Sequence, residues 1–344
     1  MIKEAIALLV DGHSLSMEQA AEVMEELTEG QVTPAQFGAF VTALRMKGEA
    51  PDEIAGLAGV MRAKSIRVNT TGPVIDVVGT GGDNSGSFNI STAAAFVAAG
   101  AGIKVAKHNN RAMTSHCGSA DVLEALGIRI ELDAGQVEEC LEKVGIGFMF
   151  APGFHPATKF AVAPRREIGI RTIFNILGPL TNPALVETQV IGVPTTELGE
   201  KIAQVLYRMG SRHSLVVNGL NGMDEITISS GSQVWELHDG EITSYQVSPE
   251  DFGLASAGVE TTRGGTPQEN AAILRSVLAG NKGPHRDVVL MNTAAAAMVG
   301  GRTGSLSGLA ALKEGMAIAQ ESIDSGQAGE KLEKLAKLSQ SLAG

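Results

Sequence analysis

The chain has 344 residues and a formal net charge of −11, which argues against nonspecific binding to DNA or RNA. It contains no apolar run of membrane-spanning length and no signal-peptide pattern, and Cys117 and Cys140 lack the spacing of a zinc site or a disulfide framework. We therefore expect a cytoplasmic protein that binds neither nucleic acid nor a membrane.

The first 67 residues predict only helices. Apolar residues recur there at helical spacing, separated by turn residues, in the segments 2–10, 17–27, 35–46 and 53–64. Thr33 followed by Pro34 is typical of a helix start, because threonine caps the first turn and proline suits the first helical position. The apolar stripes indicate a small helical bundle, and they are also compatible with a dimer contact.

The most informative motif is Gly79-Thr80-Gly81-Gly82-Asp83, which follows the apolar run 74–78. The run predicts a buried strand of a parallel sheet, and the glycines permit positive φ and close approach of a ligand. An Ala-rich helix is predicted at 91–99, with Ser91 or Thr92 as its cap. Glycine turns and helix starts attract anions, so we interpret the motif as a phosphate site, although such turns are often only structural. It matches neither a P-loop nor a dinucleotide fingerprint.

A second polar segment ends the predicted strand 103–107. It contains Lys107-His108-Asn109-Asn110-Arg111 and then Thr114 to Ser119, which leads into a helix predicted at 118–126. Two cations, several hydroxyl groups and a helix start predict a second phosphate site. It should converge with the first site because neighbouring strand ends meet at one edge of a sheet. The alternative is a solvated polar loop.

Two further groups of residues are candidates for the site. Arg165 lies in the Pro- and Gly-rich stretch 151–183 and has the geometry to bind a carboxylate through two hydrogen bonds. His155 in the same stretch is equally compatible with a structural role. Asp224-Glu225, which follows the predicted strand 214–217 and a turn at Gly219 and Gly222, suits Mg²⁺ bound to a diphosphate, although acidic pairs on turns are commonly just solvated. A further strand is predicted at 224–228.

Alternating strand and helix patterns after residue 73 predict an α/β fold, with a mainly parallel sheet flanked by helices and a smaller all-helical domain. The remaining strands are expected at 147–150, 187–193 and 213–218. Residues 231–248 instead predict an antiparallel excursion that turns at Asp239-Gly240. The remaining helices are expected at 134–143, 195–209, 267–279, 285–299 and 305–323.

In this order, the motifs resemble the anthranilate phosphoribosyltransferase family over essentially the whole chain. The most specific blocks are 118–127 and 171–183, and the blocks at 270–272 and 292–296 also agree. The resemblance implies transfer of the 5-phosphoribosyl group from phosphoribosyl diphosphate (PRPP) to the amine of anthranilate. The products are N-(5-phosphoribosyl)anthranilate and diphosphate, and the pathway is tryptophan biosynthesis.

The resemblance also implies an organisation and a set of site residues. A helical domain at 1–70, joined by helices near 165–185, would mediate a homodimer, and 71–344 would form the α/β domain that binds PRPP. The PRPP-binding residues would be Gly79, Gly82, Asp83, Ser87, Asn89, Ile90, Ser91, Thr92, Lys107, Ser115 and Ser119. Anthranilate would contact Gly79, His108, Asn110, His155, Arg165 and Gly178. A pair of Mg²⁺ ions would be bound by Ser91, Asp224 and Glu225, and no general base would be required.

The chain departs from the family pattern in two places. Asn109 stands where the family usually has glycine, and it narrows the space beside the substrate. Ser115, His116 and Cys117 stand where small or basic residues are more usual. Two other functions stay open, a pyrimidine-nucleoside phosphorylase of the same fold family and an inactive relative that binds nucleic acid.

Overall fold

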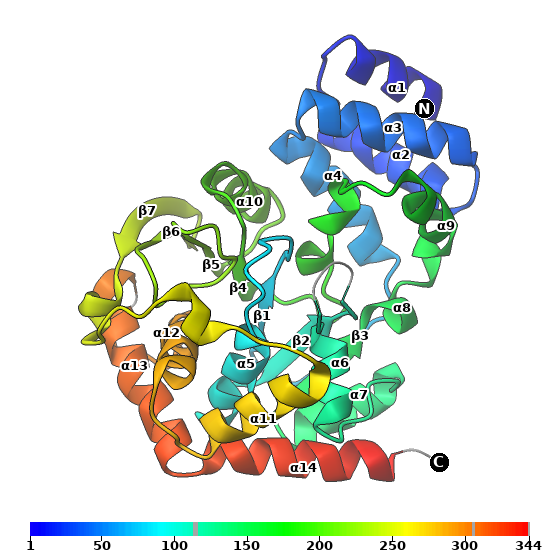
Figure 1. Ribbon diagram of the computed structural model, residues 1–344. Helices are drawn as coiled ribbons and strands as arrows, with labels where there is room; N and C mark the ends of the chain where they lie inside the picture. The colour runs from blue at the N-terminus through cyan, green and yellow to red at the C-terminus, as the bar shows by residue number, and fades with distance from the viewer. Residues whose placement is uncertain (113–115, 305–306, 343–344) are drawn as a thin grey trace.

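The computed structural model describes residues 1–112, 116–304 and 307–342 (Figure 1). A bundle of helices at the N-terminus stands beside a larger part built around one sheet, and the C-terminal helix runs along the far side of that sheet (Figure 1). None of the described helices combines the length and apolarity needed to cross a membrane.

The N-terminal bundle confirms the helices predicted from apolar spacing. Its members are α1 (Ile2–Val10), α2 (Met17–Thr28), α3 (Pro34–Lys47) and α4 (Pro51–Ala63). Thr33 caps α3 by accepting a hydrogen bond from the Gln36 N–H, with Pro34 at the first helical position. The apolar stripes meet inside the bundle, where Phe37, Phe40 and Leu44 are buried.

Within the described residues, seven strands form one sheet in the order β3-β2-β1-β4-β5-β6-β7. The strands are β1 (Ile75–Gly79), β2 (Val105–Asn109), β3 (Ile146–Phe150), β4 (Thr188–Gly192), β5 (His213–Gly219), β6 (Ser232–His238) and β7 (Glu241–Val247). β1 to β5 pair in parallel, whereas β6 and β7 are antiparallel. The mainly parallel sheet and the hairpin turn at Asp239-Gly240, where both φ angles are positive, are therefore confirmed.

Two strand predictions were wrong in ways that affect the site. Residues 224–228 form no strand, because side chains satisfy their backbone groups. Asn292 Oδ1 accepts from the Ile226 N–H at 3.0 Å, and Asn292 Nδ2 donates to the Ile226 carbonyl at 2.9 Å. β2 extends two residues beyond its predicted end, because it pairs with β3 up to Asn109, opposite Phe150. Lys107 and His108 are thus strand residues.

Helices cover the sheet and confirm most of the remaining expectations. They are α5 (Ile90–Gly100), α6 (Ser119–Ala125), α7 (Ala134–Lys143), α10 (Thr196–Arg208), α11 (Pro267–Leu278), α12 (Pro284–Val299) and α13 (Gly308–Asp324). The sequence did not predict α14 (Gln327–Ser341), which buries Leu332 and Leu335. α8 (Ala151–Phe154) lies before the stretch near 165–185, and α9 (Lys159–Ile168) ends just inside it. After Ile168 this stretch contains only 3-10 turns, at Ile173–Asn175 and Gly178–Leu180.

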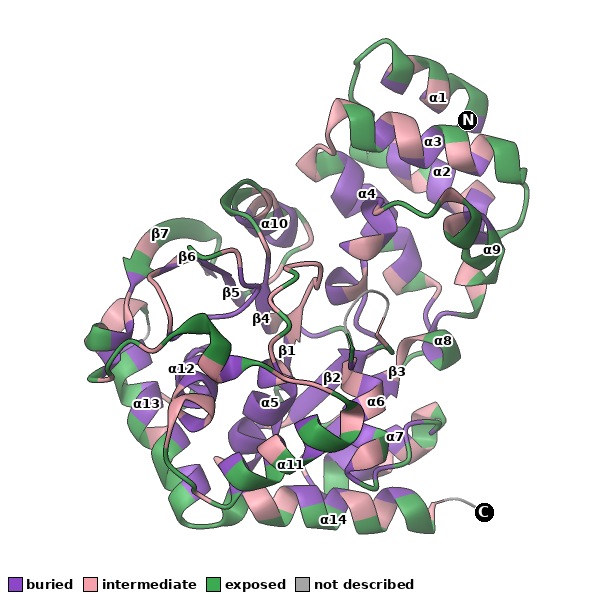
Figure 2. Cartoon of the chain, viewed as in Figure 1, coloured by how far each residue is buried: buried purple, intermediate pink, exposed green. Residues whose placement is uncertain are grey.

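Two buried apolar clusters form on opposite sides of the sheet. One surrounds α5 and α12, which are buried nearly all round (Figure 2). The other joins α1 to α4 to the 173–180 segment, α10 and the opposite face of β4, β5 and β6. The bundle therefore shares a core with the sheet, and this shared core holds the 173–180 segment near the carboxyl end of β2.

Candidate active site

The glycine motif lies at the carboxyl end of β1 and wraps around a carboxylate. The Gly81 N–H donates a hydrogen bond to Asp224 Oδ2 at 2.8 Å. A Cβ atom on Gly79 would lie 2.3 Å from the same oxygen, so only glycine permits this approach. The loop and the 224–226 segment are therefore built against each other.

The start of α5 differs from the prediction that Ser91 or Thr92 is its cap. Asn89 occupies the cap position without a side-chain capping bond, and Ser91 lies within the first turn. The Ser91 N–H instead donates to Glu225 Oε1 at 3.1 Å. A carboxylate thus occupies the place where a helix start favours negative charge. Thr92 Oγ1 donates to Ser119 Oγ at 3.2 Å and links α5 to α6.

The ammonium group of Lys107 lies near three carboxylates, those of Asp76, Glu225 and Asp224, and Asp83 lies near Asp224. Lys107 Nζ donates to Ser91 Oγ at 3.2 Å and also to the Val77 carbonyl. Burial lowers the pKa of Lys107, and the charges of Asp76, Glu225 and Asp224 oppose that change. Burial raises the pKa of Asp224 to about 7, and the charge of Asp83 adds to the increase.

These acidic residues fit a divalent cation. Burial and the charge of Asp224 raise the pKa of Glu225 well above its ordinary value. Asp83 Oδ2 is buried and has no hydrogen-bond partner in the described part of the chain. Carboxylate oxygens are the ligands that Mg²⁺ prefers, and an ion would remove the repulsion that the raised pKa values report.

Arg171 completes the glycine loop, and sequence reasoning did not single it out. Its Nη2 donates to the Gly81 carbonyl at 3.0 Å. A Cβ on Gly82 would lie 1.8 Å from Arg171 Nη1, and Gly82 has a φ of 82°. Gly82 is therefore required both by its backbone conformation and by the packed guanidinium. The sequence signal that could have identified Arg171 is its position as the first residue of the specific block 171–183.

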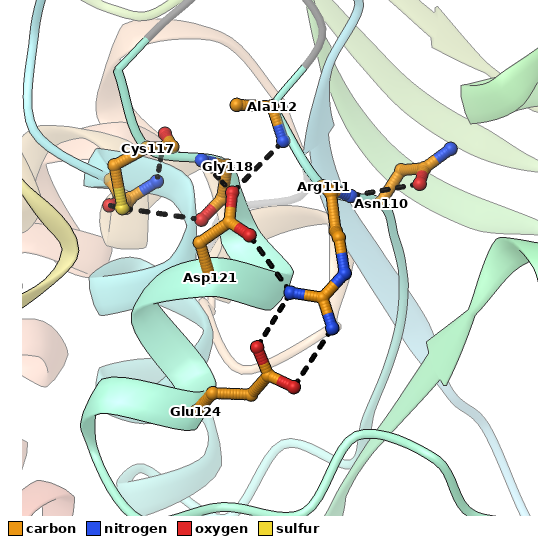
Figure 3. A network of polar contacts seen from close by, with 8 residues as sticks. Asn110, Arg111, Ala112, Cys117, Gly118, Asp121 and Glu124 are labelled. Atoms are coloured by element: carbon orange, nitrogen blue, oxygen red, sulfur yellow. Dashed lines mark hydrogen bonds and ion pairs between the residues drawn. The ribbon is translucent and has the colours of Figure 1, made fainter.

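The second polar loop does not supply two cations. Arg111 forms ion pairs with α6, with Nη1 2.6 Å from a Glu124 oxygen and 3.1 Å from an Asp121 oxygen (Figure 3). Asp121 Oδ2 also accepts from the N–H groups of Ala112 and Gly118 at 3.0 and 2.8 Å. Arg111 is thus a structural residue, because two carboxylates on α6 attract it.

Further residues of the glycine-loop segment and of the second polar segment have the following surroundings in the described part of the chain. Ser115 lies outside the described residues, and His116 is exposed. Cys117 Sγ lies 3.4 Å from Asn89 Oδ1, and burial raises the pKa of its thiol to about 11. Ser87 Oγ accepts from Ser85 Oγ at 3.1 Å, and Ile90 is buried.

Two late asparagines hold the site elements in place. Asn270 Nδ2 donates to Asn89 Oδ1 at 2.9 Å, and Asn89 Nδ2 donates to the Cys117 carbonyl at 3.2 Å. Asn292 holds the 224–226 segment through its bonds to Ile226. The blocks around both asparagines were noticed in the sequence, but their positioning roles were not.

The proposed acceptor residues lie on the opposite face of β2. His108 Nδ1 and the Gly178 carbonyl are 3.0 Å apart, so Nδ1 carries the proton. The rings of His108 and His155 have centroids 4.9 Å apart. Burial lowers the pKa of His108 to about 3, with a contribution from His155, and burial lowers the pKa of His155 to about 4. Both imidazoles are therefore neutral at pH 7.

Arg165 and Asn110 are less constrained. The Arg165 guanidinium carbon lies 5.3 Å from the Phe174 ring centroid, and burial lowers its pKa. It forms no ion pair with any carboxylate of the described residues. Asn110 is exposed, and its Oδ1 accepts from the Arg111 N–H at 2.8 Å. The structure shows no direct hydrogen bond between either residue and His108 or His155 among the described residues.

Comparison with known proteins first identifies the class of protein to which the chain belongs. Residues 71–329 match the glycosyl transferase family a/b domain, and residues 3–65 match the glycosyl transferase family helical bundle domain. The fold and the site thus define a glycosyltransferase with a helical bundle and an α/β domain.

Individual relatives give the particular family. The anthranilate phosphoribosyltransferase of Dehalococcoides mccartyi is 60% identical and is aligned over 100% of this chain and 99% of its own. The enzyme of that name from Thermus thermophilus has a crystal structure with a TM-score of 0.91 at 42% identity, covering 98% of this chain and 99% of that one. The Saccharomyces cerevisiae enzyme in complex with PRPP and Mg has a TM-score of 0.89 at 30% identity, covering 99% and 98%. The chain belongs to the anthranilate phosphoribosyltransferase family.

Proposed function

We propose that this protein transfers the 5-phosphoribosyl group of PRPP to the amine of anthranilate and releases diphosphate, as a step of tryptophan biosynthesis. One observation carries the proposal. The N–H groups of Gly81 and Ser91, the carboxylates of Asp224 and Glu225 and the ammonium of Lys107 converge at the carboxyl ends of β1 and β2. This is a site for a metal-bound, multiply charged phosphate ligand.

The donor would be bound at this convergence. The glycine-loop amides, the start of α5 and Lys107 would contact its diphosphate, where negative charge develops as the bond to the anomeric carbon breaks. Because these contacts stabilise the departing diphosphate more strongly than the bound donor, they lower the activation barrier more than they tighten the binding of PRPP. The residues proposed for the donor are Gly79, Gly82, Asp83, Ser87, Asn89, Ile90, Ser91, Thr92, Lys107, Ser115 and Ser119.

Magnesium is the metal that this site suits. The yeast relative was solved with PRPP and Mg, and the acidic oxygens described above fit the same ion. Asp224, Glu225 and the Ser91 hydroxyl would hold it, as a pair of ions in each site. When bound, Mg²⁺ would neutralise charge on the leaving diphosphate.

The acceptor would lie at the carboxyl end of β2, where its amine can reach the donor, against His108, His155 and Gly178, with Gly79 and Asn110 as further proposed contacts. Arg165 forms no ion pair within the described chain, so its guanidinium is available for the carboxylate of anthranilate. The neutral histidines add no charge beside it. An aromatic amine carries no proton at neutral pH, so the site needs positioning rather than a general base.

The organisation of the chain remains part of the proposal. The proposed domains are 1–70, joined by the segment near 165–185, and 71–344. The shared apolar cluster of α1 to α4 with residues 173–180 supports that grouping. A homodimer through the helical domain and a cytoplasmic location stay predictions.

The decay of anthranilate fluorescence in the presence of PRPP and Mg²⁺ tests the function. We expect turnover that a chelator abolishes and that excess Mg²⁺ restores. Phosphorolysis of thymidine or uridine by a folded, metal-supplied sample that leaves anthranilate untouched would assign the site to a nucleoside phosphorylase instead. A shift of DNA in a gel at moderate salt, without turnover of either substrate, would indicate a nucleic-acid-binding relative.

A further inference from the structure

The side chain of Asn109 is buried without any hydrogen bond. Asn109 is 6% exposed, and neither its Nδ2 nor its Oδ1 has a partner among residues 1–112, 116–304 and 307–342. A buried polar group without a partner destabilises a folded protein, and native proteins rarely keep one without a reason. Asn109 ends β2 at the edge of the sheet where ligands bind in α/β folds, so a ligand is the physical reason to consider.

Strand geometry places this carboxamide on the donor side of β2. Alternate residues of a strand point to the same face, so Asn109 shares its face with Lys107, whose Nζ contacts Ser91 Oγ at the start of α5. His108 points to the opposite face, where it contacts Gly178 and His155. The Asn109 carboxamide and the proposed acceptor residues therefore lie on opposite faces of β2, and the two substrates would meet beyond the carboxyl end of the strand.

The hydrogen-bonding groups of the carboxamide indicate which part of the donor it would bind. A phosphate group offers only acceptors, so it would satisfy Nδ2 and leave Oδ1 facing negative charge. A hydroxyl group both donates and accepts, and two neighbouring hydroxyls satisfy the oxygen and the nitrogen of one carboxamide together. The ribose ring of PRPP carries such a pair.

We propose that Asn109 binds the ribose hydroxyls of the donor and makes the site selective for a ribosyl over a deoxyribosyl group. The proposal rests on the proposed function, since it takes the sugar from PRPP. It assigns a role to a residue at a position where the family usually has glycine, which offers no side-chain hydrogen bond.

The test compares the wild type with Asn109→Leu, which keeps the branched shape of the side chain and replaces both polar atoms by methyl groups. Ribose 5-phosphate and 2-deoxyribose 5-phosphate serve as probes in calorimetry, so the result does not depend on turnover. We expect the wild type to bind ribose 5-phosphate about 2- to 150-fold more tightly than its deoxy analogue, the range for one or two lost hydrogen bonds. In the variant this ratio should fall to about one. An unchanged ratio would overturn the proposal.

Steady-state kinetics and stability provide independent readouts. Asn109→Leu should raise the KM for PRPP and leave the KM for anthranilate within about twofold, whereas Arg165→Ala should show the reverse pattern. The melting temperature of the free protein should stay level or rise in Asn109→Leu, because an unsatisfied carboxamide has been removed. Asn109→Gly, which has the usual residue of the family, is a second variant expected to lose the sugar preference. A selective increase in the KM for anthranilate would place Asn109 on the acceptor side and refute the inference.

Discussion

The glycine loop offers a quantitative test, because two adjacent glycines differ in what surrounds them. Gly81 and Gly82 both have positive φ, 68° and 82°. A Cβ on Gly81 would meet nothing within 4 Å, whereas a Cβ on Gly82 would lie 1.8 Å from Arg171 Nη1. Gly81→Ala should therefore carry only the cost of the left-handed backbone, and Gly82→Ala should also displace the guanidinium.

The magnitudes follow from these contacts. A left-handed non-glycine residue costs about 1–2 kcal/mol, so Gly81→Ala should weaken PRPP binding by up to roughly 5- to 30-fold when the free variant loop relaxes and must regain this conformation to bind. Gly82→Ala additionally loses the charge-assisted bond from Arg171 to the Gly81 carbonyl, worth about 1.5–3 kcal/mol, for a total of roughly 70- to 5,000-fold. The two variants should thus differ clearly although they are neighbours.

Calorimetric titration with PRPP and Mg²⁺ measures the effect, and thermal unfolding checks that each variant is folded. The double variant Gly82→Ala with Arg171→Ala completes a cycle. Since the alanine then meets no guanidinium, the two changes should be less than additive in free energy. Equal losses for Gly81→Ala and Gly82→Ala, or strict additivity in the cycle, would refute the role given to Arg171.

Two further predictions concern the buried titratable groups. The double variant Asp224→Asn with Glu225→Gln keeps the acceptor oxygens for the N–H groups of Gly81 and Ser91. It should lower turnover and raise the midpoint, which is the Mg²⁺ concentration that gives half-maximal turnover, because the metal acts where leaving-group charge develops. The exposed pair Asp239→Asn with Glu241→Gln is the control, and wild-type turnover with an unchanged midpoint in the first variant would exclude the metal role. The second prediction concerns pH. The pKa of His108 in the folded state is about 3, below its ordinary value of 6.5. The neutral imidazole therefore contributes fully to stability above pH 6.5. This contribution is lost as the pH falls, because only the unfolded chain then takes up the proton. His108→Gln should flatten the decline of the unfolding free energy between pH 6 and 4.5 by up to about 1.4 kcal/mol per pH unit. Equal slopes in denaturant titrations of His108→Gln and the wild type would contradict the neutral burial of His108.

Local sequence patterns alone predicted much of the secondary structure of this protein. Apolar spacing located α1 to α4, and turn chemistry located the hairpin at Asp239-Gly240, because such signals depend on residues a few positions apart. The apolar run also located the glycine motif correctly at the end of a strand, and phosphate binding by that motif stays a prediction. Even here, the end of β2 was missed by two residues, since its pairing with β3 extends the strand.

Tertiary structure decided which side chains serve the site. Asp224 reaches the Gly81 N–H across 143 positions, and Glu225 reaches the Ser91 N–H across 134. Arg171 was not singled out, although it holds the loop from 90 positions away. Arg111 was expected beside Lys107 as a second cation for phosphate, and the structure pairs it with Glu124 and Asp121 on the next helix. The physical reason is the same in each case. A charged side chain takes the nearest satisfactory partner in space, and the distance between partners is set by the packing of sheet and helices rather than by their spacing in the sequence.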